Sequence, residues 1–464
     1  MNTADALSGI AGLEGIRWML AGTPLRALRR ELAALLTPPS RLGPSHLRLS
    51  RFSPGRKLEA FYDVHILPEG KGQQIMRPIA VAWRLDGKGR GTTELADMEV
   101  EAQRRGVSAP FQKLVADVPA LKMHVEVSPI DAHYPQAVRV CDPGHVSNMI
   151  ASAVWRDHVP ASQYSVTYIR YRPGKRHVLC YEPQGEPKRG AIYAKLYTDG
   201  KSAKAFQLAE QIAEWLAEHG AGVTSVRPLA YIAEDGVVLY PQVLGAQLSE
   251  LLQRPGQSLG RALKDIGAVL RVLHQLPKEV TGPLELHDFT AKVKEKHILT
   301  LLPSTGAKMD AVIEGAQSLL ERLPSETCSF TYGDFKAEHV WVRPAGLILI
   351  DFDSCRWGDP ALDIGKFLAD LQFWCAVYSR QELKEAQEQF LAGYGRGIPA
   401  ERLMRARLYE VVELVKLTAR RLRRFENDWV YQTERLIGLA ESLLNDFQSR
   451  WGSHTRERET HGSS

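Results

Sequence analysis

The sequence predicts an α+β fold with a strand-rich first half and a helical second half. Short runs of alternating apolar residues recur between residues 46 and 244, whereas the chain after residue 245 shows apolar positions at helical spacing. Two aspartates on short turns, Asp334 and Asp351, are joined by apolar strands within the second half. Because 464 residues exceed what one core usually supports, we expect two or three packed units.

The composition is that of a globular protein, and it argues against several classes of function. With 59 basic and 54 acidic residues the net charge is only +5, too balanced to indicate a nucleic-acid or membrane-surface partner. The five cysteines are widely spaced and lack a CxxC pair, which argues against a disulfide framework or a zinc site. No leader-like segment or apolar stretch of roughly 18 residues is present, so we expect a cytoplasmic protein.

Residues 329–365 are the most informative stretch. In FTYGD, Gly333 lets the chain turn after a strand and places Asp334 at the mouth of a loop. After a Pro-Ala-Gly turn, the strand LILI runs directly into Asp351 and Asp353. Phosphoryl transfer needs one carboxylate near the attacking hydroxyl and another that holds magnesium against the nucleotide phosphates. An ordinary hairpin explains a single turn aspartate, but it does not explain the spaced set.

This stretch resembles the aminoglycoside phosphotransferase and choline kinase superfamily, whose catalytic loop reads HGDxxxxN and whose metal strand reads IDxxxxxxGDPxxDLA. Asp351 matches the metal-binding aspartate, residues 358–360 match GDP, and Asp363 matches the aspartate that braces the catalytic loop. The resemblance covers about residues 160–450. It implies a protein-kinase-like bilobal fold, with a β-sheet N-lobe and a helical C-lobe, and a small-molecule kinase that uses ATP and Mg²⁺.

The sequence departs from this pattern at two positions. Tyr332 stands where the family usually has histidine, and His339 stands where it has the asparagine that supplies a second metal ligand. Magnesium prefers oxygen ligands, so an imidazole at this position favours manganese. We expect His339 to ligate the metal together with Asp351 and with help from Asp353. The alternative is a loop histidine packed under the hairpin.

The N-terminal part predicts helices followed by a repeated strand pattern. Residues 12–37 show two short amphipathic helices. The signature R-x-x-P-G-[RK] then occurs at residues 51–56 and again at 170–175, and a later strand of each copy ends in Asp-Gly-Lys, at 86–88 and 199–201. Two turn signatures in the same order favour a duplicated antiparallel sheet over chance similarity.

The second copy carries a lysine suited to the phosphates of a nucleotide. In AIYAKLY, Lys195 stands amid alternating apolar residues, as the phosphate-contacting lysine of a kinase-like strand would. Aligned on the Asp-Gly-Lys turn, the first copy has Ala82 at this position, so it looks like a degenerate nucleotide lobe. The next segment is an amphipathic helix, in which Glu210 is the expected partner of Lys195 and Glu214 is the reserve candidate.

Further nucleotide contacts are expected from a turn and from a hinge. The turn with Arg172 and Gly174 replaces a glycine-rich loop and could cap phosphates, although a charged hairpin turn has comparable weight. The strand GVVLYPQVLG ends where the family's hinge holds adenine. Its hinge candidates are Gln242, Val243 and Leu244.

The predicted organisation has five parts. These are a helical segment over 1–45, a degenerate N-lobe-like domain over 46–150, a nucleotide-binding N-lobe over 151–244, a helical C-lobe with the catalytic loop over 245–451, and a disordered polar tail over 452–464.

The predicted activity is transfer of the γ-phosphoryl group from ATP to a hydroxyl of a small molecule. Asp334 would accept or orient the hydroxyl proton, Asp351 would bind magnesium, and Lys195 would hold the phosphates. The alternative is a catalytically impaired pseudokinase, a nucleotide-binding or interaction protein, which Tyr332 and His339 favour. A protein kinase fits less well, because no activation segment separates Asp351 from the GDP motif. The sequence pattern does not identify the acceptor.

Overall fold

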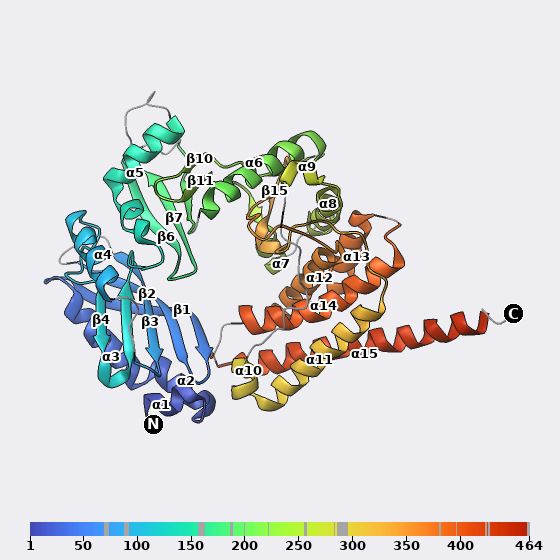
Figure 1. Cartoon of the computed structure of the whole chain (residues 1–464), viewed down its shortest axis with the longest axis horizontal. Helices are drawn as coiled ribbons and strands as arrows, with labels where there is room; N and C mark the ends of the chain where they lie inside the picture. The colour runs from blue at the N-terminus through green and yellow to red at the C-terminus, as the bar shows by residue number, and fades with distance from the viewer. Residues whose placement is uncertain are drawn as a thin grey trace. The chain divides into compact units, whose positions relative to one another are not determined.

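The computed structural model of the chain consists of two compact units (Figure 1). The first unit holds Met1–Gln207 and Arg227–Gln242, and the second holds Leu208–Val226, Val243–Leu422 and the chain from Asn427 onward. The structure describes residues 1–68, 74–87, 92–155, 163–185, 189–198, 200–220, 222–254, 258–282, 284, 296–379, 382–395, 397–422, 425 and 427–461.

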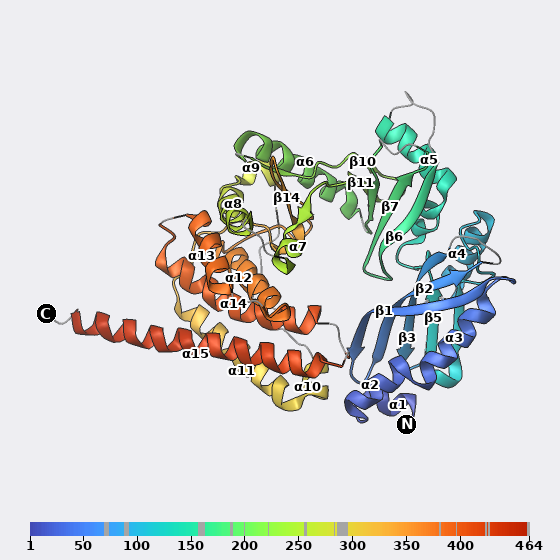
Figure 2. The ribbon, with the colours of Figure 1, turned by 180° about the vertical axis from the view of Figure 1, so that it is seen from behind.

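Three helices begin the first unit: α1 (Thr3–Ser8), α2 (Gly12–Ala21) and α3 (Thr23–Leu35). The two helices predicted for residues 12–37 are therefore present. Pro24 lies in the first turn of α3, where its missing N–H costs nothing, and Leu28 and Leu32 are buried. Both views show α3 running alongside the first sheet (Figure 2).

The first sheet has five antiparallel strands in the order β1-β2-β3-β5-β4, and helix α4 follows its third strand. Leu58, Val81 and Trp83 are almost completely buried on its strands, as alternating apolar residues at a sheet face require. The elements are β1 (Arg41–Ser53), β2 (Lys57–Leu67), β3 (Ile75–Arg84), α4 (Thr92–Arg104), β4 (Val115–Val118) and β5 (Met123–Val127).

The second sheet repeats this topology. Its order is β6-β7-β8-β11-β10, again with a helix after the third strand, which bears out the predicted duplication. Of the shared Asp-Gly-Lys turn, Lys88 and Asp199 lie outside the described residues. The elements are β6 (Tyr164–Arg172), β7 (Arg176–Pro183), β8 (Ile192–Leu196), α6 (Lys201–His219), β10 (Ala230–Ile232) and β11 (Val237–Pro241).

Short elements connect the two sheets within the first unit. They are η1 (Pro119–Leu121), η2 (Pro135–Ala137), η3 (Arg139–Cys141), α5 (Pro143–Ile150) and the π-helical segment η4 (Ala151–Trp155).

The second unit combines two small sheets with a helical core. One sheet has the order β12-β14-β15-β9, and the other pairs β13 with β16. Their strands are β9 (Val223–Ser225), β12 (Ala246–Gln247), β13 (Ser329–Thr331), β14 (Val340–Arg343), β15 (Gly346–Leu349) and β16 (Arg356–Gly358), and η5 (Ala337–His339) precedes β14.

The helices of the second unit pack around α12 and α14, which lie side by side (Figure 1). Phe367 on α12 and Phe390 on α13 are fully buried, with ring centres 4.5 Å apart. The helices are α7 (Leu248–Gln253), α8 (Ser258–Leu273), α9 (Lys278–Thr281), α10 (Lys296–Leu301), α11 (Pro303–Arg322), α12 (Ala361–Val377), α13 (Leu383–Tyr394), α14 (Ala400–Arg421) and α15 (Trp429–His461).

Helix α15 differs from the expectation for the tail. It continues to His461, whereas we expected disorder from Gly452 onward. A lack of apolar residues predicts the absence of packing, but arginine and glutamate are good helix formers, so a polar run can extend a helix that is already nucleated.

The fold class predicted from the sequence is confirmed: a kinase-like α+β fold, with a sheet lobe, a helical lobe and a preceding second sheet domain. The chain passes from the first unit to the second between Gln207 and Leu208 and again between Gln242 and Val243. The boundaries predicted for the five segments stay predictions. Among the described helices, none has the length and apolarity that crossing a membrane requires.

Candidate active site

The loop that carries Asp334 is fixed by one buried carboxylate. Asp363, at the start of α12, accepts hydrogen bonds from the backbone amides of Tyr332 at 2.7 Å and Gly333 at 2.8 Å. Its Oδ2 atom also lies 3.2 Å from His274 Nε2, while His274 Nδ1 lies 2.8 Å from the Tyr394 hydroxyl. His274 therefore supports the carboxylate that braces the loop.

Gly333 is required by the shape of this loop. Its φ is +77°, and a Cβ atom there would lie 2.2 Å from the carbonyl oxygen of Ser354. Any side chain would therefore force the loop away from the segment that carries Asp351.

Tyr332 joins the two carboxylate-bearing segments. Its side chain is fully buried, and its hydroxyl donates a hydrogen bond to the carbonyl oxygen of Ile350, directly before Asp351. Burial raises the pKa of Tyr332, so the phenol keeps its proton. Asp351 itself has a φ of +67°, a left-handed conformation that is uncommon for a residue with a side chain and often marks functional sites.

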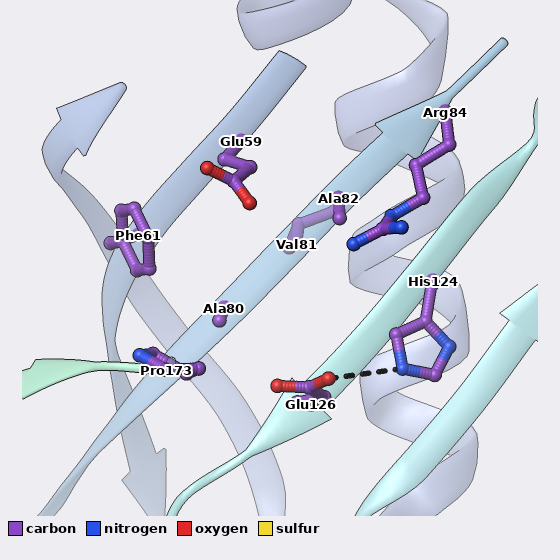
Figure 3. A pocket seen from close by; sticks show the side chains of 9 residues that line it. All are labelled: Glu59, Phe61, Ala80, Val81, Ala82, Arg84, His124, Glu126 and Pro173. Atoms are coloured by element: carbon purple, nitrogen blue, oxygen red, sulfur yellow. Dashed lines mark hydrogen bonds and ion pairs between the residues drawn. The ribbon is translucent and has the colours of Figure 1, made fainter. Parts of the chain in front are cut away.

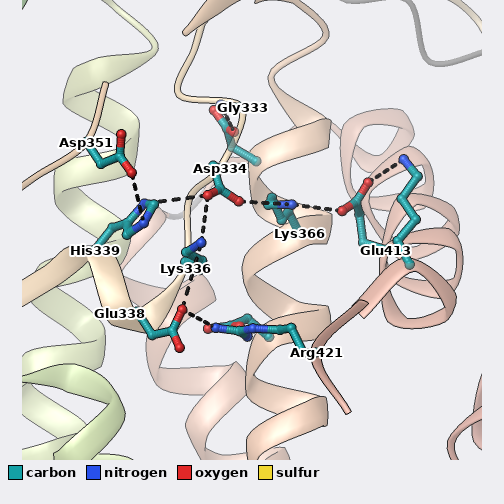
Figure 4. A network of polar contacts seen from close by, with 12 residues as sticks. Gly333, Asp334, Lys336, Glu338, His339, Asp351, Lys366, Glu413 and Arg421 are labelled. Carbon is teal, nitrogen blue, oxygen red and sulfur yellow. Dashed lines mark hydrogen bonds and ion pairs between the residues drawn. The ribbon is translucent and has the colours of Figure 1, made fainter. Parts of the chain in front are cut away.

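Asp334 lies between two lysines (Figure 4). Lys336 Nζ is 2.7 Å from its Oδ2 atom, and Lys366 Nζ is 3.5 Å from its Oδ1 atom. Burial alone raises the pKa of Asp334, but the charges of Lys366 and Lys336 outweigh burial and hold the pKa below its ordinary value. The carboxylate is therefore ionised at neutral pH and can accept a proton.

Behind Asp334, a chain of alternating charges runs into the helical core. Lys366 on α12 lies 2.9 Å from Glu413 on α14, and Glu413 lies 2.6 Å from Lys416. The two lysines hold the pKa of Glu413 down to about 2 despite its burial, and Glu413 with Asp334 raises the pKa of Lys366 although burial lowers it. The sequence reasoning missed this chain. Its signal was Glu413 within the apolar run LYEVVELVKL, where a glutamate without a partner would be costly.

A second set of charges holds the end of the same loop. Arg421 at the end of α14 forms ion pairs with Glu338 of the loop and with Asp370 of α12. Asp370 also accepts a hydrogen bond of 2.7 Å from the backbone amide of Ala337. The loop is thus fixed at both ends by carboxylates of α12.

His339 lies between the two predicted catalytic carboxylates (Figure 4). Its Nε2 atom is 3.5 Å from Asp351 Oδ2, and its Nδ1 atom is 3.8 Å from Asp334 Oδ2. The side chain is buried, and Nδ1 makes no hydrogen bond within the described residues. Burial and the nearby charge of Lys336 lower the pKa of His339 to about 4, so the imidazole is neutral at physiological pH.

These residues fit a divalent ion that is completed by other ligands. Two atoms 3.5 Å apart, as in His339 and Asp351, can both contact one ion at about 2.1 Å. A neutral imidazole and a carboxylate are suitable donors for manganese, and the carboxylate also suits magnesium. Within the described chain, no three histidine, cysteine, aspartate or glutamate side chains form a preformed metal group. Magnesium is often held by one or two carboxylates plus nucleotide phosphates, which agrees with such an incomplete set. Asp353 is exposed beside Asp351, and its expected help stays a prediction.

The predicted nucleotide residues lie on both units. Lys195 is on β8 of the first unit, opposite Val178 and Val238, and its Nζ atom lies 5.5 Å from the centre of the Tyr197 ring. Glu210 is on the part of α6 that belongs to the second unit, so the pairing of Lys195 with Glu210 stays a prediction.

The hinge candidates stand where the chain changes unit. The backbone amide of Gln242 donates to the carbonyl of Ala191 at 3.0 Å, and its side-chain oxygen accepts from the Ala191 amide at 3.2 Å. Leu244 is 68% exposed, which leaves it accessible to a ligand. The role of Gln242, Val243 and Leu244 toward adenine stays a prediction.

The turn with Arg172 and Gly174, which was predicted to cap phosphates, makes a hydrogen bond to another part of the chain. The amide of Gly174 donates to Asp131 Oδ2 at 2.7 Å, so this group is not available to a phosphate. The two residues are 43 positions apart, and no local sequence pattern indicates that they meet; the role of Gly174 toward phosphates stays a prediction. The role of Arg172 toward phosphates also stays a prediction.

The corresponding face of the first sheet carries two glutamates, a histidine and an arginine (Figure 3). Ala82 lies opposite Glu59 and His124, in the same register in which Lys195 lies opposite Val178 and Val238. Glu126 joins this face, and the pocket there has a volume of about 20 Å³, room for a water molecule only. The expectation that the first copy binds no nucleotide stays a prediction.

Comparison with known proteins agrees with the sequence motifs. Residues 184–406 match the model of the Phosphotransferase enzyme family, APH, which confirms the resemblance stated from the sequence. This segment contains Lys195, Asp334, Asp351 and Asp363. No curated protein sequence matches the chain significantly.

Solved structures of small-molecule kinases are similar at low sequence identity. The spectinomycin phosphotransferase APH(9)-Ia in complex with ADP and spectinomycin is 11% identical, with 66% of this chain and 98% of that chain covered and a TM-score of 0.45. The amicoumacin kinase hAmiN in complex with AMP-PNP, Ca²⁺ and Ami is 18% identical, with coverages of 60% and 88% and a TM-score of 0.43. A choline/ethanolamine kinase family protein from Mesorhizobium loti is 17% identical, with coverages of 57% and 84% and a TM-score of 0.40.

Proposed function

We propose that the chain is a small-molecule phosphotransferase of the family whose model matches residues 184–406, and that it transfers the γ-phosphoryl group of ATP to a hydroxyl of its acceptor. The observation that carries the proposal is the position of Asp334. Its loop is held at both ends by carboxylates of α12, and two lysines keep it ionised. Its Oδ2 atom lies 3.8 Å from Nδ1 of His339.

Asp334 acts on the acceptor in this proposal. The acceptor hydroxyl gives its proton to a carboxylate oxygen of Asp334 while its oxygen forms the new bond to the γ-phosphorus. The bond between that phosphorus and the β,γ-bridging oxygen breaks, and ADP leaves with the electron pair. Lys336, 2.7 Å from Asp334, is close enough to offset negative charge that develops beside the carboxylate.

Asp351 and His339 would hold the divalent ion, with Asp353 in support. When bound, the ion neutralises the charge of the nucleotide phosphates. Lys195 would contact the same phosphates with Glu210 as its partner, and Gln242, Val243 and Leu244 would provide the adenine hinge. Mg²⁺ is the expected ion, and Mn²⁺ would be accepted through the imidazole of His339.

A pseudokinase is the second candidate, because His339 replaces the amide ligand of the family pattern and is buried, and its Nδ1 atom makes no hydrogen bond within the described residues. Such a protein would bind nucleotide without turnover. The retained Asp334, Asp351 and Lys195 favour the enzyme, since a protein without turnover needs no ionised carboxylate in the braced loop.

The test uses the full chain, MgATP or MnATP, and a panel of hydroxyl compounds that includes amino sugars, amino alcohols and simple sugars. We expect ADP and a phosphorylated product from at least one acceptor class. Asp334→Asn should lower kcat by at least about 100-fold while MgATP still raises the melting temperature, because the lost group acts on the acceptor. Turnover by Asp334→Asn within a few-fold of the wild type would refute the assignment. Nucleotide binding with no turnover in any metal would favour the pseudokinase.

A further inference from the structure

A cleft of about 460 Å³ opens in the second unit where the ends of α8 and α13 meet the segment before β13. The two helices lie side by side (Figure 1). Gly267 of α8 allows their close approach, because a Cβ atom there would lie 2.0 Å from the carbonyl oxygen of Phe390 on α13. Asp334, Asp351 and His339 are not among the residues that line the cleft. A cavity of this size holds a small molecule, so the second unit has room for a ligand outside the proposed active site.

The cleft carries an arginine without a counter-charge. Arg271, in the last turn of α8, is exposed and makes no hydrogen bond or ion pair within the described residues. Its guanidinium group lies against Gly395, where an added Cβ atom would be 2.5 Å from Nη1. Glu326 is the one carboxylate among the described lining residues, and two other arginines engage it. Arg402 Nε lies 2.8 Å from its Oε1 atom, and Arg405 forms an ion pair with its Oε2 atom. Arg271 therefore remains to bind an anion from solution.

The other lining residues favour an organic anion with a single charge. Pro360, Ile398 and Pro399 supply apolar surface in the same cleft. A carboxylate forms two parallel hydrogen bonds with a guanidinium group. A group with two negative charges fits less well, because one unpaired cation does not balance it and Glu326 repels it. The cleft therefore suits a carboxylate on a small apolar body.

Tyr394, at the wall of the cleft, belongs to a hydrogen-bond chain that reaches the catalytic loop. Arg402, which has only donors, donates from Nη1 to the Tyr394 oxygen at 2.9 Å. Burial raises the pKa of Tyr394, so its hydroxyl keeps a proton and donates it to His274 Nδ1 at 2.8 Å. We assign the imidazole proton to Nε2, which lies 3.2 Å from Asp363 Oδ2 and donates to it. Asp363 holds two amides of the loop that carries Asp334, so a chain of donors runs from the cleft to this loop.

We propose that Arg271 binds a small organic carboxylate in this cleft and that the bound ligand slows phosphoryl transfer at Asp334. A carboxylate is a better acceptor than a neutral imidazole nitrogen, since charge-assisted hydrogen bonds are roughly twice as strong as neutral ones. When the Tyr394 hydroxyl turns to the ligand, His274 Nδ1 loses its donor and Asp363 is held less firmly. The slowing rests on the proposed kinase function, whereas binding by Arg271 does not.

Alkylation of Cys328 measures occupancy of the cleft. Cys328 lines the cleft and is exposed, whereas the other four cysteines are buried. The full chain is treated with iodoacetamide, and the modified cysteine is identified by peptide mass spectrometry. Benzoate and hexanoate should slow alkylation of Cys328 saturably, by about fivefold or more relative to sodium chloride at matched ionic strength. Benzamide, the uncharged match of benzoate, should give no protection, and phenyl phosphate should protect about tenfold more weakly.

Replacement of Arg271 tests the anion site directly. Arg271→Met keeps the aliphatic stem of the side chain and should raise the benzoate concentration for half protection by about tenfold or more. Its activity without benzoate should equal that of the wild type. Arg261→Met is the matched control, because Arg261 is an exposed arginine of the same helix that does not line the cleft. Equal protection of Cys328 in Arg271→Met and the wild type would overturn the site, as would no protection by either carboxylate in the wild type. Protection by benzamide or phenyl phosphate as strong as that by benzoate would overturn the assignment to a carboxylate.

Steady-state kinetics of ADP formation test the link to the catalytic loop. Saturating benzoate should lower kcat of the wild type by about fivefold or more and leave KM for MgATP unchanged, because the lost hydrogen bond supports the loop and not the nucleotide. Tyr394→Phe interrupts the chain permanently, so its kcat should be low without benzoate. Benzoate should lower it no further, although Cys328 is still protected.

Two kinetic outcomes would overturn the link. One is protection of Cys328 in the wild type without a change in kcat. The other is a Tyr394→Phe variant that benzoate still inhibits, since Tyr394 would then act on the fold alone. A wild type without turnover for any acceptor would remove the proposed function and the slowing with it, and the alkylation of Cys328 would still decide whether Arg271 binds a carboxylate.

Discussion

Replacement of Lys366 by methionine tests the charge chain behind Asp334. The ammonium group of Lys366 lies 3.5 Å from the carboxylate of Asp334, and at an effective dielectric constant of about 20 the attraction between these two charges is about 5 kcal/mol. Lys336 remains at 2.7 Å and water reaches part of the carboxylate, so the realised effect is a fraction of that value. At 1.36 kcal/mol per pKa unit, we expect the pKa of Asp334 to rise by about one to two units.

The sign of the pH effect follows from the depressed pKa of Asp334 in the folded chain. The ion pair stabilises the fold above the ordinary pKa of aspartate, about 4, and that stabilisation is lost as the pH falls through the depressed value. In Lys366→Met, the acid limb of the kcat/KM profile should therefore move to higher pH by one to two units. The free energy of unfolding at pH 7 should fall by about 3 kcal/mol, because Glu413 keeps one buried partner instead of two.

The assay is a pH series of kcat/KM for ADP formation, combined with urea unfolding. Lys416→Met is the matched control, because Lys416 contacts Glu413 at the far end of the chain and not Asp334. It should lower stability without moving the acid limb by more than a few tenths of a unit. An acid limb of Lys366→Met that coincides with the wild type would refute the reasoning, even if the protein were less stable.

Three more predictions follow from the site. Asp351→Ala and Lys195→Ala should each reduce the rise in melting temperature that MgATP produces, since both remove charges that complement phosphates or metal; unchanged shifts in both would exclude a kinase-like pocket. His339→Asn should lower the ratio of the manganese-supported rate to the magnesium-supported rate, and an equal ratio in both proteins would leave His339 a packing role. Because the pKa of His339 is lowered to about 4, its protonation should reduce wild-type activity only near that pH and not just below neutrality. Gly333→Ala should lower kcat by about tenfold or more and lower the free energy of unfolding by about 1–3 kcal/mol, because its Cβ atom would lie 2.2 Å from the carbonyl oxygen of Ser354. Steady-state kinetics and urea titration measure the two effects, and wild-type behaviour would contradict the loop geometry.

Much of the fold could be predicted from local sequence patterns. The repeated turn signature predicted two sheets of one topology, and the gap-free alignment that placed Ala82 opposite Lys195 agrees with the strand registers. Asp363 was assigned as the brace of the catalytic loop from its spacing, and its two backbone hydrogen bonds agree with that role. Such features depend on neighbours in sequence or on fixed spacing, which a single sequence contains.

Contacts between distant segments could not be predicted in the same way. Lys366 and Glu413 are 47 positions apart, and Asp131 and Gly174 are 43 apart, so their meeting depends on how helices and sheets pack. The shifted pKa of His339 likewise comes from burial, which the loop sequence does not reveal. The hydrogen bond from the Gly174 amide to Asp131 was not predictable for the same reason, and the role of Gly174 toward phosphates stays a prediction.

Two consecutive sheets of one topology create a hazard during synthesis, because a hairpin of one copy can add to the strands of the other. The ladders differ in length: β2 and β3 pair over ten residues, from Lys57 to Ile66, whereas β7 and β8 pair over five, from His177 to Tyr181. An exchanged hairpin would leave about half of the longer ladder without hydrogen-bond partners, and buried unpaired amides are costly. Unequal strand length therefore disfavours the exchange of hairpins between the two copies.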